Sequence, residues 1–215
     1  KEMIPQTEMM LFFASRVQLA EEKVGPALRD GRTVLLDRYY FSTAAYQGPF
    51  VLGGYDRVLE IAEQLGLPRI VSIQNAYHLM NRTFESGLAE ICRHHNVGLL
   101  AYSPLAFGWL TGKYIDDPNA NGRITLFPGF GQRYNKPNVP AATKEYMRIA
   151  QEAGLTPATL ALAFARTRWF NSSVILGATS LKQLKENLDS AEIGLSPETL
   201  GEIEAVHKLI PSPAP

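Results

Sequence analysis

The 215-residue sequence has little cysteine, no excess of either charge and no long apolar run. Its single cysteine, Cys92, cannot form an internal disulfide, which excludes a disulfide-stabilised scaffold. Lys+Arg and Asp+Glu both number 21, so no long-range field would attract nucleic acid or an anionic membrane surface. With neither a spanning segment nor a signal peptide in view, we expect a cytoplasmic setting, no membrane or nucleic-acid partner, and a local site for any charged ligand.

What remains is the composition of a globular protein. Hydrophobic residues make up 46% of the chain and charged residues 20%, which excludes a disordered or collagen-like polypeptide. The length suffices for one sizeable core or two small ones. A (β/α)8 barrel needs about 250 residues, so this chain has room for only part of one.

Periodicity predicts alternating helices and strands, which is typical of βα units and a parallel sheet. We expect helices at about 7–28, 55–65, 84–94, 143–153, 157–168, 180–190 and 197–207, and strands at 33–36, 70–73, 98–102 and 171–176. Thr7, Thr156 and Ser180 are predicted N-caps, and Gln183 would complete a capping box with Ser180. Residues 116–140 are expected to form a long loop. The Gly- and Pro-rich stretch 49–54 is the predicted junction between segments 1–50 and 55–215.

The sequence at the carboxyl ends of three predicted strands resembles the second half of an aldo-keto reductase. It includes Ile73-Gln74-Asn75-Ala76-Tyr77, then Tyr102-Ser103-Pro104-Leu105 with Leu110-Thr111-Gly112-Lys113-Tyr114, and finally Ile175-Leu176-Gly177-Ala178-Thr179. The resemblance covers about residues 55–215 and is nearest to the subgroup of potassium-channel β subunits and related bacterial reductases. It implies a partial TIM-barrel fold. Ligands of such folds bind at the carboxyl ends of the parallel strands, which is where these motifs lie.

The resemblance also implies a site for NADP. Gln74 matches the glutamine that binds the nicotinamide carboxamide, and Tyr102 the aromatic residue that stacks on the nicotinamide ring. The turn that approaches the pyrophosphate and the loop at the adenosine end supply the other cofactor-binding residues, which are Ser103, Leu105, Gly108, Lys113, Gly177, Thr179, Gln183, Glu186 and Asn187. Gln183 stands where many relatives have an arginine against the 2′-phosphate. Arg123, in the long loop, is a candidate to close over the cofactor.

The catalytic Asp, Tyr, Lys and His of that family lie on segments before the fifth barrel strand. No residue of this chain matches those positions, so no catalytic residue is assigned. We therefore expect an NADP-binding oxidoreductase of the carbonyl-reducing type with compromised or no turnover. An isolated half-barrel would expose apolar surface and two sheet edges, so we expect the chain either to form a homodimer that covers them or to fold poorly.

The first 50 residues resemble the middle of a thymidylate kinase, through Thr7 to Arg16 and the run Asp37-Arg38-Tyr39-Tyr40-Phe41-Ser42-Thr43-Ala44-Ala45-Tyr46-Gln47-Gly48. This similarity implies a P-loop-kinase-like α/β segment. The nucleotide-binding residues it implies are Phe12, Arg16, Asp37, Arg38, Ser42, Tyr46 and Gln47. Arg38 would grip the phosphate of dTMP, because a guanidinium forms two charge-assisted hydrogen bonds with it.

Three functional hypotheses stay open. The first is the NADP-binding reductase, and the second is dTMP phosphorylation with ATP and Mg. The sequence contains no G-x-x-x-x-G-K-[ST], the loop with which such kinases hold ATP phosphates. The third is a fusion remnant that binds a nucleotide without turnover. Asp37 and Arg38 have an alternative reading as a structural ion pair, and no histidine or cysteine has metal-ligand spacing.

Overall fold

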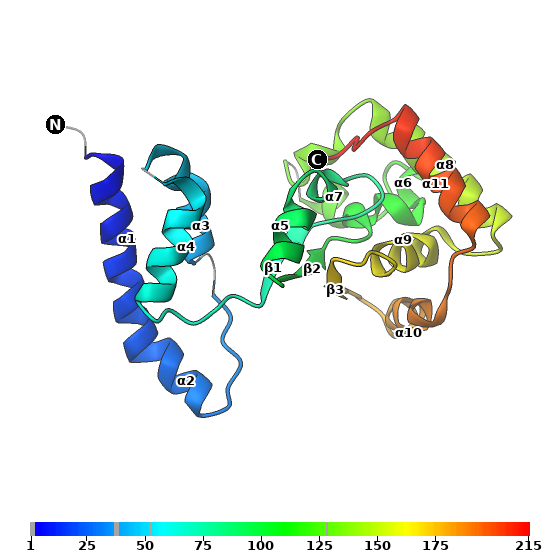
Figure 1. Cartoon of the computed structure of the whole chain (residues 1–215). Helices are drawn as coiled ribbons and strands as arrows, with labels where there is room; N and C mark the ends of the chain where they lie inside the picture. The colour runs from blue at the N-terminus through cyan, green and yellow to red at the C-terminus, as the bar shows by residue number, and fades with distance from the viewer. Residues whose placement is uncertain (1–2, 37–38, 52, 128) are drawn as a thin grey trace. The chain divides into compact units, whose positions relative to one another are not determined.

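The structure is a computed structural model that describes residues 3–36, 39–51, 53–127 and 129–215. The chain forms two compact units, Lys1–Ile70 and Val71–Pro215 (Figure 1). The units divide after the helix at 54–64, because that helix packs into the core of the first unit. The predicted junction at 49–54 separates two segments that resemble different families, not two compact units, and it stays a prediction.

Unit 1 (residues 1–70) consists of helices in its described part. They are α1 (Pro5–Leu19), the π-helical turn η1 (Ala20–Val24), α2 (Gly25–Arg29), α3 (Tyr40–Tyr46), the 3-10 turn η2 (Gly48–Phe50) and α4 (Gly54–Gln64). The helix expected at 7–28 is interrupted by η1 just before Pro26, because proline has no N–H to continue the α-helical ladder. The N-cap prediction at Thr7 is wrong, since α1 begins at Pro5 after Ile4.

The predicted strand at 33–36 is also wrong. These residues adopt no regular structure, and the side chain of Leu35 is 84% exposed. A strand needs a neighbouring strand for its ladder of hydrogen bonds, and no strand lies in the described part of this unit. The core forms between helices instead, around Phe13, Ala44 and Val58, which are buried together.

Unit 2 (residues 71–215) is the α/β part of the chain. Its strands are β1 (Ser72–Ala76), β2 (Gly98–Tyr102) and β3 (Asn171–Val174), and its α-helices are α5 (Leu88–His94), α6 (Lys113–Asp116), α7 (Arg123–Leu126), α8 (Asn138–Glu152), α9 (Pro157–Arg166), α10 (Leu181–Asp189) and α11 (Pro197–Leu209). Short 3-10 turns are η3 (Thr83–Glu85), η4 (Ala106–Thr111), η5 (Gln132–Tyr134) and η6 (Ser190–Glu192). The predicted loop at 116–140 thus contains α7 and η5, and α8 begins before it ends.

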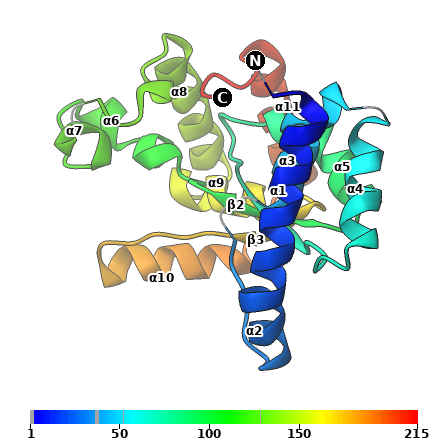
Figure 2. The same ribbon diagram turned by 90° about the vertical axis from the view of Figure 1, so that its left-hand side faces the viewer.

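The sheet is parallel with the order β1-β2-β3, which confirms the predicted α/β class. The described residues hold three strands rather than the four expected. Leu99 and Ala101 of β2 are fully buried, whereas Leu100 and Tyr102 are half-buried and Gln74 is exposed. Since side chains alternate between faces, the helices cover the face of Leu99 and Ala101. Figure 2 shows α9 against the sheet and α10 beside α9.

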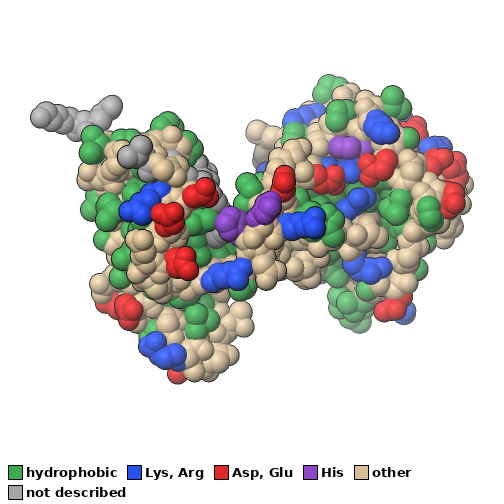
Figure 3. All heavy atoms as spheres, in the orientation of Figure 1, with side chains coloured by type: hydrophobic (Ala, Val, Ile, Leu, Met, Phe, Trp, Pro, Cys, Tyr) green, Lys and Arg blue, Asp and Glu red, His purple; other side chains and the backbone are tan. Residues whose placement is uncertain are grey.

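The surface agrees with the balanced composition. Acidic and basic side chains are interspersed on the face of unit 2 drawn in Figure 3. No helix in the described part of the chain is long and apolar enough to cross a membrane.

Candidate functional site

The carboxyl ends of the three strands meet at one edge of the sheet. The register pairs Gln74 with Leu100 and Ala76 with Tyr102, and the Ile175 N–H donates to the carbonyl of Ala101 at 2.8 Å. Paired residues of neighbouring strands share a face, so Gln74 and Tyr102 project from the same face, on which Gln74 is exposed and Tyr102 half-buried. The two residues expected to hold the nicotinamide therefore lie on adjacent strands, and Tyr102 is two residues further along its strand than the residue paired with Gln74.

The turn that follows Tyr102 has a strained backbone. Ser103, Ala106 and Phe107 adopt left-handed φ angles of 55°, 49° and 56°, and Gly108 follows at 97°. Each such non-glycine residue costs about 1–3 kcal/mol and persists only where its surroundings impose it, which is common at binding sites. In the described part of the chain the N–H groups of Ser103 and Leu105 have no hydrogen-bond acceptor. Free amides in a tight turn are what an anionic group requires.

Lys113 lies directly against this turn. A Cβ built on Gly108 would come within 2.8 Å of its Cε, and the φ of 97° at Gly108 is one that favours glycine. The Lys113 ammonium donates to the carbonyl of Asn121 at 3.0 Å. The structure thus brings together Gly108 and Lys113 and places a cation against the turn.

The residues expected at the adenosine end form a second group, around the loop 177–180 and the first turns of α10. The side-chain oxygen of Gln183 accepts hydrogen bonds from both the N–H and the hydroxyl of Thr179, at 2.9 and 3.0 Å. Asn187 is buried and donates to the carbonyl of Gly177 at 3.2 Å. Glu186 accepts a hydrogen bond from Thr156, the N-cap of α9. This loop is therefore held in shape by the residues predicted to bind there.

The capping prediction at α10 is correct in one half. Ser180 is the N-cap and accepts the N–H of Gln183 at 3.3 Å. The side chain of Gln183 does not return to Ser180, as a capping box requires, but closes the loop through Thr179. Thr156 caps α9 as predicted, with the N–H of Thr159 at 3.1 Å.

Two aromatic residues, Phe107 and Tyr134, stabilise the turn, and sequence reasoning did not single them out. Phe107 stacks on Phe130 at 5.0 Å and contacts Tyr134 at 5.1 Å between ring centroids. The guanidinium of Arg123 lies 5.4 Å from the centre of the Phe107 ring. Arg123 thus lies beside the turn, and its closure over a cofactor stays a prediction. Nothing local in the sequence indicates that Phe107 is left-handed, and Tyr134 is one aromatic among several in a Gly- and Asn-rich stretch.

Tyr134 reaches from the same loop to the end of β1. It is 1% exposed, and its hydroxyl lies 3.3 Å from Nε2 of the fully buried His78. Burial, reinforced by nearby Arg133, lowers the pKa of His78 to about 3, so its imidazole is neutral at physiological pH. Burial raises the pKa of Tyr134 to about 12, which keeps its hydroxyl protonated.

The kinase-like residues lie in unit 1. The Arg16 guanidinium lies 5.2 Å from the centre of the half-exposed Phe12 ring. Ser42 is in the first turn of α3, and Gln47 caps its end. Asp37, Arg38 and the side chain of Tyr46 lie outside the described residues, so the expected phosphate grip and its ion-pair alternative stay predictions. Three buried polar atoms lack a hydrogen-bond partner in the described part of this unit: Nη1 of Arg16, the hydroxyl of Tyr39 and Oγ1 of Thr43.

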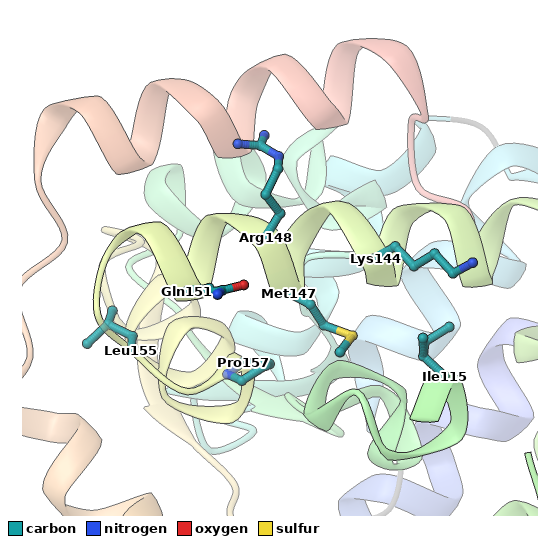
Figure 4. A pocket seen from close by; sticks show the side chains of 7 residues that line it. All are labelled: Ile115, Lys144, Met147, Arg148, Gln151, Leu155 and Pro157. Carbon is teal, nitrogen blue, oxygen red and sulfur yellow. The ribbon is translucent and has the colours of Figure 1, made fainter. Parts of the chain in front are cut away.

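A shallow hollow in unit 2 lies away from both predicted groups of site residues. It has a volume of about 540 Å³ and is lined by Ile115, Lys144, Met147, Arg148, Gln151, Leu155 and Pro157 (Figure 4). It shares no residue with either predicted group, and Arg148 points away from it to bond Glu202 at 2.7 Å. The described residues also contain no group of three or more His, Cys, Asp or Glu side chains that would hold a metal ion.

Comparison with known protein families shows which family this chain belongs to. The model of the Aldo/keto reductase family matches residues 54–208, a span that contains all three strands and both groups. The chain belongs to the aldo/keto reductase family. Its members generally use NAD(P)H. The model of the thymidylate kinase family matches residues 1–97, so the two matches overlap in α4, β1 and α5.

Individual relatives agree with this family. Protein tas of Escherichia coli (strain K12) is 49% identical over 163 residues, which are 75% of this chain and 47% of that protein. An aldo-keto reductase of Babesia bovis is 36% identical over 70% of this chain and 56% of its own length. A putative voltage-gated potassium channel subunit beta of Schizosaccharomyces pombe is 31% identical, over 70% and 46% respectively. This aldo/keto reductase chain spans about half the length of the curated relatives it matches.

Proposed function

We propose that unit 2 binds NADP(H) at the carboxyl edge of its sheet, as the cofactor-binding half of a carbonyl-reducing oxidoreductase. The observation that carries the proposal is the register that puts Gln74 and Tyr102 on one face of the sheet, next to a strained turn. In that turn the N–H groups of Ser103 and Leu105 have no acceptor among the described residues. A bound nicotinamide would supply the hydride for carbonyl reduction. No residue in the 215 matches the catalytic tetrad of the family, so we expect these residues to bind the cofactor without turning over a carbonyl substrate.

The observed groups fit the parts of a dinucleotide. Tyr102 would stack on the flat nicotinamide ring while Gln74 binds its carboxamide. The amides of Ser103 and Leu105, with Lys113 beside Gly108, would hold the pyrophosphate. The loop 177–180 and the N-terminal turns of α10 would hold the adenosine. Gln183 is neutral where many relatives have arginine, so NADP selectivity would depend on hydrogen bonds rather than on a cation at this position.

The direct test is titration of the full chain with NADPH, followed by cofactor fluorescence and by thermal shift. We expect saturable binding that Tyr102→Ala and Gln183→Ala each weaken. The same titration with NADH measures the preference for the 2′-phosphate. An unchanged melting temperature and fluorescence at millimolar NADPH would contradict the proposal.

A second candidate function, binding of a thymidine nucleotide by unit 1, is favoured by one observation. Nη1 of Arg16, the hydroxyl of Tyr39 and Oγ1 of Thr43 are buried without a partner among the described residues, and an unpaired buried donor or acceptor costs about 1–3 kcal/mol. A pyrimidine with carbonyl and N–H groups, stacked on Phe12, would satisfy such atoms. ATP and Mg would have no phosphate loop within these 215 residues, so we expect binding of dTMP rather than its phosphorylation.

Titration with dTMP distinguishes this second function from the first. A thermal shift that Arg16→Ala and Arg38→Ala abolish, while NADPH binding is retained, would support it. Failure of both ligands to bind would contradict both functions.

We also propose that a second copy of the chain covers exposed apolar surface of unit 2. Val71 before β1 is 73% exposed, and Leu181, Leu184 and Leu188 expose one apolar side of α10 by 84%, 41% and 57%. Apolar surface and unpaired strand edges of this kind favour self-association.

A further inference from the structure

A chain of contacts links the end of β1 to the strained turn after β2. His78 lies two residues beyond β1, and its backbone forms reciprocal hydrogen bonds with Asn81 at 3.1 and 2.8 Å. Its Nε2 contacts the Tyr134 hydroxyl at 3.3 Å, and the Tyr134 ring packs on Phe107. The strand that carries Gln74 is thereby connected to the turn expected to bind the pyrophosphate.

The hydrogen bonds of His78 determine which atom is the donor in its contact with Tyr134. The N–H of Met80 donates to Nδ1 at 3.2 Å, so Nδ1 carries the lone pair. The proton of the neutral ring is then on Nε2, which donates to the Tyr134 oxygen. A tyrosine held by a buried donor on an immobile segment has little freedom to rotate away from Phe107.

Phe107 needs such an anchor, because its backbone conformation is one that a phenylalanine rarely adopts. Tyr134 packs against its ring, Phe130 stacks on it, and the Tyr114 hydroxyl donates to its carbonyl at 3.3 Å. Among these contacts, Tyr134 is the one that is itself bonded to the end of β1.

We propose that Tyr134 is a positioning residue for the dinucleotide pyrophosphate: it anchors Phe107 to the end of β1 and so fixes the turn whose amides bind the phosphates. The inference rests on the proposed NADP(H) site. Tyr134 does not touch the reacting atoms, and its effect on the ligand passes through Phe107.

The test compares two ligands in the full chain by calorimetry. NADPH requires the turn, whereas adenosine 2′-monophosphate occupies only the loop 177–180 and α10. Tyr134→Phe keeps the ring and removes the hydroxyl, so we expect about fivefold weaker NADPH binding, the effect of one lost hydrogen bond. Binding of adenosine 2′-monophosphate should be unchanged, which a general loss of structure would not permit.

Tyr146→Phe is the matched control. Tyr146 is a buried tyrosine of the same unit whose hydroxyl bonds the carbonyl of Leu79, next to His78, at 3.1 Å. Loss of the Tyr146 hydroxyl should leave the affinities for NADPH and for adenosine 2′-monophosphate unchanged. Phe107→Gly supplies a second arm, because glycine adopts the left-handed turn without an anchor. In that background Tyr134→Phe should have no further effect on NADPH binding.

Three results would overturn the inference: wild-type affinity for NADPH in Tyr134→Phe, an equal loss for both ligands, or additive effects of Tyr134→Phe and Phe107→Gly. A wild-type chain that binds no NADPH is a separate outcome. It would overturn the proposed function, and this inference with it.

Discussion

Gln74 and Tyr102 project from the same face of neighbouring parallel strands, because the register pairs Gln74 with Leu100 and Ala76 with Tyr102. Residues 28 positions apart in the sequence thus become neighbours at one edge of the sheet. An amide and an aromatic ring on one face can bind a flat, polar ring from its edge and from one side. The nicotinamide site that we propose therefore depends on this pair.

Tyr102→Ala should weaken NADPH binding about tenfold, since stacking of one aromatic pair contributes about 0.5–1.5 kcal/mol beyond its buried area. Tyr102→Trp keeps a flat ring and should retain most of the affinity. Fluorescence titration of the three proteins checks this. Equal affinities in all three would remove Tyr102 from the site.

Gly108→Ala should impair both binding and folding of the turn. A Cβ would meet Lys113 at 2.8 Å, and the φ of 97° is unfavourable for alanine. We expect a lower melting temperature and at least about tenfold weaker NADPH binding, a loss of roughly 1.4 kcal/mol or more. The control is Gly201→Ala in α11, where a Cβ meets nothing within 4 Å. Alanine in a helix interior should stabilise that variant by up to about 1 kcal/mol.

Arg82→Met should destabilise unit 2. Arg82 is 5% exposed and bonds Glu85 at 2.8 Å and Glu204 at 3.0 Å. Removing one member of a buried ion pair costs about 3–5 kcal/mol, and the lower end applies because both glutamates are partly exposed. Urea unfolding measures the loss. Arg148→Met removes three exposed ion pairs and should change stability little, which separates burial from the number of pairs.

Stability should fall as the pH decreases from about 6.5 towards 3, in part through His78. Its pKa is 6.5 for an unperturbed side chain and about 3 in the folded protein, because burial, with Arg133, opposes its charged form. In this window the unfolded chain binds a proton that the folded chain does not. Each pH unit therefore costs up to about 1.4 kcal/mol. Urea unfolding at several pH values should show a shallower slope for His78→Asn than for the wild-type chain.

The proposed self-association predicts a dimer in size-exclusion chromatography with light scattering. Leu181→Glu and Leu188→Glu place charges on the exposed apolar side of α10 and should shift the protein to monomers. A matched charge reversal on another helix, at the exposed Lys208 of α11 (Lys208→Glu), should not. A wild-type monomer at high micromolar concentration, with a cooperative melting transition, would contradict the proposal.

Local sequence signals determined much of this molecule. Hydrophobic periodicity and caps located β2, α9, α10 and α11 to within a few residues, because these elements depend on their own apolar faces and on Thr156, Ser180 and Ser196. The motifs at the strand ends also sufficed to indicate the family. A parallel sheet then follows from the alternation of strand and helix.

Only the tertiary structure decided the rest. The apolar run at 33–36 does not form a strand, because a strand depends on a neighbour that the local sequence does not specify. The left-handed conformation of Phe107 and its anchor through Tyr134 to His78 join positions 27 and 56 residues apart, and packing alone brings them together. The sequence therefore determined which residues are candidates for the site, whereas long-range contacts decided which of them meet, since contact energies depend on partners that periodicity cannot identify.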